Sequence, residues 1–183
     1  MGFWFMTTTD VGTPTTTSTT DVGLLVLRIA AGATVLQAGL IKAFDFNTTV
    51  GFMESGGWRL ADLAAFMVTA AETLGGIGLL LGALTPLAAC AVIAAMLDAW
   101  AVNVSTGAFW SQPFNMPFLV AFIAAALLFT GAGAYSVDAR LIGRSRWPIP
   151  AAVGLLVVAI AAALVTWIAL NGTNPIHVTA PTG

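Results

Sequence analysis

Three charged side chains lie in or at the end of stretches that are otherwise apolar, and they are the residues best placed to do chemistry. Glu72 lies near the middle of residues 60–82, Arg28 lies in residues 22–41, and Lys42 follows that stretch. A carboxylate at mid-depth in a bilayer is costly unless it is paired, protonated or turned toward a wet cavity. A helical rise of about 1.5 Å per residue puts Arg28 about 9 Å and Glu72 about 15 Å from the same side of the membrane. The sequence therefore predicts an Arg28–Glu72 ion pair inside a helical bundle.

A second polar group is predicted near the opposite side of the membrane. Lys42 shares a helical stripe with Arg28, so both should face the interior. The secondary polar or stacking candidates are Asp62, Asp98, Trp100 and Asn103, with Trp58 and Trp110 as further stacking rings. Two interpretations stay open. In the structural one, Arg28 and Glu72 lock the bundle together, Lys42 extends to the headgroups, and the aspartates are solvated. In the functional one, Arg28, Glu72 and Lys42 line a pocket for a quinone head group, a small anion or a proton.

The amino-acid composition is typical of an integral membrane protein. It is 58% hydrophobic and 8% charged, whereas soluble domains carry about 25% charged residues. The net charge of −2 does not indicate a nucleic-acid partner. Cys90 and His177 are the only cysteine and histidine, which excludes an intrachain disulfide, bis-histidine haem ligation and a cysteine-rich iron–sulfur site. No metal site and no built-in cofactor are predicted.

Five apolar segments of about membrane-spanning length organise the chain. They cover residues 22–41, 60–82, 86–104, 117–131 and 150–170. The link at residues 83–85 is so short that the second and third segments must form an antiparallel hairpin. We predict an all-α membrane protein, with an antiparallel four-helix transmembrane bundle over residues 22–141 and a fifth transmembrane helix over residues 150–171. A threonine-rich, disordered tail (1–21), a basic loop (142–149) and a C-terminal tail (172–183) complete the predicted organisation.

The positions of the arginines predict how the protein is oriented in the membrane. Arg140, Arg144 and Arg146 lie together between the fourth and fifth segments, and cytoplasmic loops are enriched in Lys and Arg. The N-terminus should then be cytoplasmic and the C-terminus outside, with the aromatic-rich loops 44–59 and 105–116 facing outward. The expected location is the plasma (inner) membrane of a bacterium.

Three motifs in order resemble the DoxX/DoxD family of membrane proteins. Residues 27–32 (LRIAAG) and 37–42 (QAGLIK) are similar to the family's first helix, and residues 72–82 (ETLGGIGLLLG) to its second. Residues 131–138 (GAGAYSVD) resemble its closing GxGxxSxD motif. The resemblance covers residues 22–141 and implies a four-helix membrane bundle, to which the fifth helix is an addition.

The resemblance also implies a functional context. DoxD-type members are subunits of a thiosulfate:quinone oxidoreductase, and DoxX-type members are linked to a membrane complex with superoxide dismutase and a thiosulfate sulfurtransferase. Arg28, Lys42 and Glu72 stand at the family's polar motif positions. This chain departs from the pattern where many relatives have histidines: it has Ala38 before Gly39, and Trp100 and Asn103 after the third helix. A chemistry that requires those histidines is therefore in doubt.

Three functional hypotheses follow. The first is an accessory or quinone-facing component of a membrane oxidoreductase system, related to thiosulfate, sulfur or oxidative stress, which binds a quinone and works with other membrane or peripheral oxidoreductase proteins. The second is a small-solute or proton transport component, since intramembrane carboxylates often belong to such pathways; the absence of a recognisable internal repeat counts against it. The third is a non-catalytic scaffold that docks partner proteins.

Overall fold

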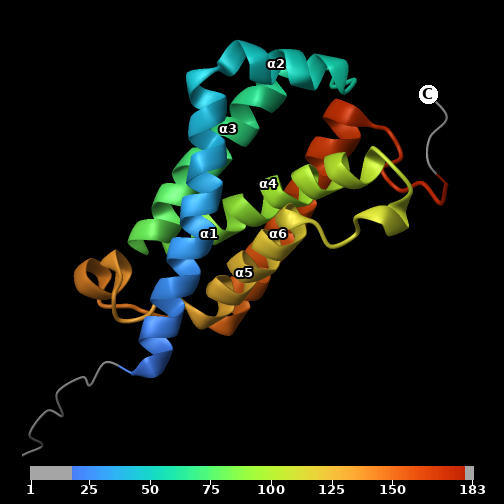
Figure 1. Ribbon diagram of the computed structural model, residues 1–183. Coiled ribbons are helices and arrows are strands. Elements are labelled where there is room, and N and C mark those ends of the chain that lie inside the picture. Colours follow the sequence, from blue (N-terminus) through green and yellow to red (C-terminus); the bar gives the residue numbers. More distant parts are fainter. Residues whose placement is uncertain (1–17, 180–183) are drawn as a thin grey trace, which may run out of the picture.

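The computed structural model describes residues 18–179, which form helices and no strands. The helices are α1 (Thr19–Phe44), α2 (Phe46–Ser55), α3 (Ala61–Leu81), α4 (Thr85–Ser105), α5 (Met116–Thr130) and α6 (Ile149–Thr166), as Figure 1 shows. Short turns of other helix types are η1 (Phe109–Ser111), η2 (Asp138–Ile142) and η3 (Trp167–Asn171). The predicted all-helical bundle is confirmed.

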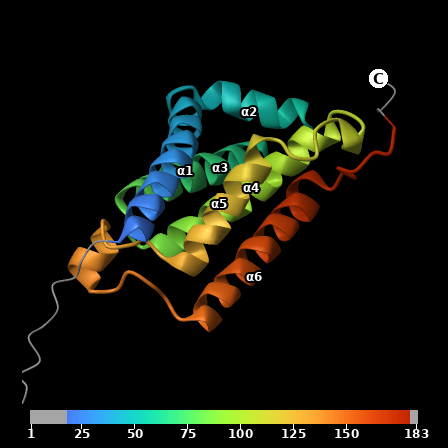
Figure 2. The ribbon, with the colours of Figure 1, turned by 60° about the horizontal axis from the view of Figure 1, so that its bottom comes forward.

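The helices are arranged around α3 and α4, which form the predicted antiparallel hairpin. α1 packs mainly on α3, whereas α5 and α6 pack mainly on α4. Figure 2 shows α6 along one edge of the bundle, beside α4 and far from α1. We call the end at which α3 turns into α4 the hairpin end. The opposite end is the α2 end, because α2 lies across it (Figure 1).

Four helical stretches are long and apolar enough to cross a membrane: Thr19–Phe44, Ala61–Leu81, Thr85–Ser105 and Ile149–Asn171. α5 is apolar but has 15 residues, which span about 22 Å against a hydrocarbon core of about 30 Å. The chain is a multi-pass membrane protein.

The first helix begins earlier than the apolar pattern indicates. Ser18 is the N-cap of α1, and its hydroxyl oxygen accepts from the backbone N–H of Asp21 while the Asp21 carboxylate accepts from the backbone N–H of Ser18. This capping box satisfies two N–H groups at the helix start. Residues 18–21, predicted as the end of the disordered tail, therefore form the cap and the first turn. Residues 1–17 of the predicted tail lie outside the described residues.

The predicted loop 44–59 is largely helical, which corrects the sequence interpretation. The Asp45 side chain caps α2 by accepting from the backbone N–H of Thr48, and Thr49 and Met53 turn one face of the helix inward. The segment contains polar residues and three glycines, so hydropathy does not mark it as helix. The Asp45 cap and the two buried side chains stabilise this segment as a helix.

Glycines set the spacing and the register of α1 against α3. A Cβ on Gly39 would come within 2.6 Å of the Thr73 backbone nitrogen, and one on Gly76 would come equally close to the backbone of Leu36. These contacts show that Gly39 takes part in close helix packing, in which small residues let backbones approach in lipid. They also place Gly39 level with Thr73, and this register decides which charged side chains can meet.

Candidate functional site

Glu72 is buried and forms an ion pair with Lys42. The Lys42 Nζ lies 2.6 Å from the Glu72 Oε2, the only such pair among residues 18–179. The Glu72 side chain is 3% exposed and the Lys42 side chain 28% exposed, so the carboxylate is sequestered while the ammonium keeps a path to the outside. Lys42 also donates weakly to the backbone oxygen of Ala38, at 3.4 Å.

The predicted Arg28–Glu72 pair is wrong. The Arg28 side chain is fully buried and donates to four backbone carbonyls at 2.8–3.0 Å, those of Leu79, Leu80, Ala132 and Tyr135. Leu79 and Leu80 belong to the last turn of α3, whose carbonyls have no partner within the helix. The guanidinium thus caps α3 at the negative end of its helix dipole.

The helix register explains the error. The depth estimate assumed that the first and second apolar helices end level with each other. In the structure Gly39 lies against Thr73 and Gly32 against Leu80. Arg28 is therefore about 18 Å along α1 from the level of Glu72, on a rise of about 1.5 Å per residue. Lys42 is less than one turn from that level, so it takes the carboxylate.

Arg28 belongs to a cluster at the hairpin end, which we call the hairpin-end cluster: Arg28, Gly82, Ser136 and Asp138. The Asp138 carboxylate accepts from the backbone N–H groups of Leu84 and Thr85, at 2.7 and 2.9 Å, and so caps α4. Gly82 has a φ of +63°, and a Cβ there would lie 2.5 Å from the Ser136 Cβ and 2.7 Å from the Arg28 Cζ. The cluster has a structural role: it caps the end of α3 and the start of α4 and holds both to the segment that follows α5.

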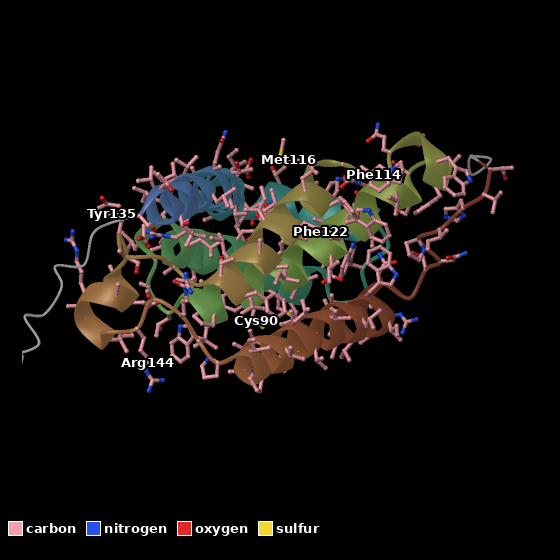
Figure 3. The ribbon with its side chains drawn as sticks, turned by 90° about the horizontal axis from the view of Figure 1, so that it is seen from below. Cys90, Phe114, Met116, Phe122, Tyr135 and Arg144 are labelled. Carbon is pink, nitrogen blue, oxygen red and sulfur yellow. The ribbon has the colours of Figure 1, made fainter. Side chains whose placement is uncertain are left out.

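Sequence reasoning did not assign Ser136 or Asp138 to any site. The signal was present, because both belong to the motif at residues 131–138 that carried part of the family resemblance. Figure 3 shows the labelled Tyr135 and Arg144 at this same end of the molecule, far from Phe114.

A cavity of about 540 Å³ lies toward the α2 end, with the Lys42–Glu72 pair in its wall. α3 and α6 both pack on α4 but scarcely on each other, which leaves space between them. α2 closes the space with Thr48, Thr49, Phe52 and Met53, and Trp58 adds an indole ring. The side chains of this α2 wall were not predicted, because the segment was interpreted as a loop.

Small side chains on α4 create the cavity. The α4 residues that line it are Ala91, Ala94, Ala95, Asp98, Ala99, Val102 and Asn103. Apart from the last, they recur at helical spacing on one face. Asp98 is the single ionisable member of this row. It is half-buried, and within residues 18–179 no hydrogen bond or ion pair reaches its carboxylate.

Of the predicted site residues, the structure brings four together and leaves three apart. Lys42, Glu72, Asp98 and Asn103 line one cavity. Asp62 is exposed, and Trp100 donates its indole N–H to the Pro113 backbone oxygen, 2.9 Å away, outside the cavity.

Arg28, like Asp62 and Trp100, lies outside the cavity. Of the predicted stacking rings, Trp58 lines the cavity, whereas Trp110 is 74% exposed. No group of three His, Cys, Asp or Glu side chains within the described range is placed to hold a metal ion.

The site combines an apolar chamber with a few polar groups. Such cavities bind small molecules whose orientation is fixed by the polar groups. An ammonium has three N–H donors and no acceptor, and an ionised carboxylate only accepts. The wall can therefore both donate to and accept from a ligand that is otherwise apolar.

A family model matches the part of the chain that holds the first two motifs. The DoxX family model matches residues 23–105, which include Arg28, Lys42, Glu72 and Asp98. The third motif, at residues 131–138, lies outside that match. No curated protein and no solved structure matches the chain. The resemblance inferred from the first two motifs is confirmed: the chain is a multi-pass membrane protein whose residues 23–105 match the DoxX family model.

Proposed function

We propose that this protein is an accessory subunit of a membrane oxidoreductase system and that its cavity binds a quinone-type ring. The observation that carries the proposal is the position of the Lys42–Glu72 pair in the wall of an apolar cavity that lies among membrane-spanning helices. A ligand reaching this place has to be soluble in lipid and also needs a polar group to meet the ion pair.

The shape of the chamber supports a flat ring. The alanine row on α4 offers a wall without protruding side chains, and Trp58 supplies an aromatic surface. Lys42 gives one strong hydrogen bond to Glu72 and a long one to Ala38. Its remaining N–H is available to the oxygen of a ring carbonyl. A quinone joins an apolar ring to such oxygens.

The redox partner is proposed to be another protein. The sequence contains one cysteine and one histidine, too few for the haem and iron–sulfur ligand sets considered above. Purification of the protein from native membranes, followed by mass spectrometry of proteins and extracted quinones, should yield an oxidoreductase subunit together with quinone. Recovery of the protein with neither would contradict this part of the proposal.

Filling the cavity should weaken the binding of a quinone. Ala95 lines the chamber and is buried, so Ala95→Leu puts extra methyl groups where the ring would lie. We expect the affinity for menadione, a quinone without an isoprenoid tail, to fall by about tenfold or more, equivalent to about 1.4 kcal/mol. The measurement is equilibrium titration of protein in lipid nanodiscs, with empty nanodiscs as the blank.

The matched control is Ala161→Leu on the exposed face of α6, which adds the same atoms toward lipid and should leave the affinity unchanged. Equal affinity in both variants, or no saturable binding to the unchanged protein, would contradict the proposed quinone site.

We also propose that the hairpin end faces the cytoplasm. Its support is the arginine group in residues 140–146, which lies on the chain just after the Asp138 cap, together with the enrichment of cytoplasmic loops in Arg and Lys. Single cysteines at Ser145 and Thr173, each in a Cys90→Ala background, should be labelled by an impermeant maleimide from the inside and from the outside respectively. The reverse pattern would contradict the orientation.

A further inference from the structure

Asp98 is an unpartnered carboxylate in the row of small residues that forms the cavity wall. The other ionisable groups that line the cavity are Lys42, from α1, and Glu72, from α3. The residues of α2 and α6 that line the cavity are uncharged. Lys42 and Glu72 neutralise each other at 2.6 Å. When all three side chains are charged, the cavity wall therefore has a net charge of −1, which comes from Asp98. When it is ionised, a carboxylate in a membrane span is costly unless water or a hydrogen-bond donor meets it, so a ligand that donates to Asp98 is favoured.

The chemistry of Asp98 restricts that partner. An ionised carboxylate accepts hydrogen bonds and cannot donate one. A quinone carbonyl also only accepts, so it gains nothing at Asp98. A hydroxyl on the same ring donates to the carboxylate, and a second hydroxyl on the ring can accept from Lys42 and donate to Glu72. Free anions such as thiosulfate or sulfite would meet an uncompensated negative charge.

We propose that Asp98 makes the cavity select a ring that carries a hydroxyl donor, so that it takes the quinol in preference to the quinone. This inference rests on the proposed function, since it assumes that a quinone-type ring occupies the cavity. It adds the redox form that is bound and the residue that distinguishes the two forms.

Three ligands of nearly the same shape test the inference. Menadiol has two hydroxyl donors, menadione has none, and 1,4-dimethoxy-2-methylnaphthalene retains the aromatic ring without donors. Dissociation constants are measured anaerobically in nanodiscs at pH 8. We expect menadiol to bind about tenfold more tightly than either of the others, which is the factor for one hydrogen bond to a charged group.

The variant Asp98→Asn preserves the size of the side chain but replaces an acceptor-only group by an amide that also donates. The preference for menadiol should fall to about twofold or less. Asp62→Asn makes the same chemical change on an exposed residue outside the cavity and should keep the full preference.

The outcomes separate the two proposals. If the unchanged protein binds menadione or the dimethyl ether as tightly as menadiol, the inference about Asp98 is overturned while the quinone-type site stands. A tenfold preference that persists in Asp98→Asn also overturns it. If none of the three ligands binds, the proposed function fails, and this inference fails with it. Saturable binding of thiosulfate would likewise contradict the charge argument.

Discussion

Replacing Arg28 with methionine should destabilise the protein more than any other single change considered above. The substitution removes a donor from four carbonyls, all held at 2.8–3.0 Å by a fully buried guanidinium. Of these four, the Leu79 oxygen still accepts from the backbone N–H of Gly82, at 3.2 Å. Buried acceptors left without a partner cost about 1–3 kcal/mol each, and relaxation of the loop lowers the sum. We expect a loss of about 4 kcal/mol, or roughly 10 °C in the melting temperature of the detergent-solubilised protein.

Two further variants give this prediction its controls. Arg140→Met alters an exposed arginine at the same end of the molecule and should change the stability by about 0.5 kcal/mol or less. Arg28→Lys keeps the charge but not the planar fork that reaches acceptors on two segments, so it should recover only part of the loss. A melting temperature for Arg28→Met within about 2 °C of the unchanged protein would mean that the carbonyls find other donors.

The Lys42–Glu72 pair should respond unequally to the loss of each partner. Lys42→Met leaves a carboxylate that is 3% exposed without its cation, and breaking such a pair costs about 3 kcal/mol or more. Glu72→Gln leaves a lysine that is 28% exposed and can turn toward water, which should cost about 1 kcal/mol. The double variant should be more stable than the sum of the single losses predicts.

The measurement is a double-mutant cycle: the thermal unfolding of the unchanged protein, the two single variants and the double variant is compared in one detergent. Glu54→Gln, which removes an exposed carboxylate on α2, serves as the control and should be close to neutral. Equal losses for Lys42→Met and Glu72→Gln would show that the two side chains are equally sequestered, and strictly additive losses would show that they do not interact.

Hydropathy predicted the long helices because lipid imposes apolar runs of fixed length. The second apolar segment, predicted at residues 60–82, is the helix Ala61–Leu81, and the third, predicted at 86–104, is Thr85–Ser105. α2 was not predicted, because the Asp45 cap and the buried side chains of Thr49 and Met53 stabilise it. These features do not change the average polarity of the segment.

The burial of Glu72 and its pairing with a cation were predictable from the cost of a carboxylate in lipid. Its partner was not, since the choice between Arg28 and Lys42 depends on how far α1 slides along α3. Close contacts at Gly39 and Gly76 set that register. The residue types around Arg28 did not indicate that backbone carbonyls, rather than a carboxylate, would accept its hydrogen bonds.

The hairpin-end cluster has a consequence for biosynthesis. Arg28 enters the membrane with the first helix, but two of its four acceptors, the carbonyls of Ala132 and Tyr135, are translated more than 100 residues later. Until the ribosome has passed that point, the nascent chain holds a guanidinium whose coordination is half complete. Commitment of the first helix to its final position therefore waits for the segment that follows α5, and a chain that ends before this segment would hold an arginine with two of its four acceptors missing.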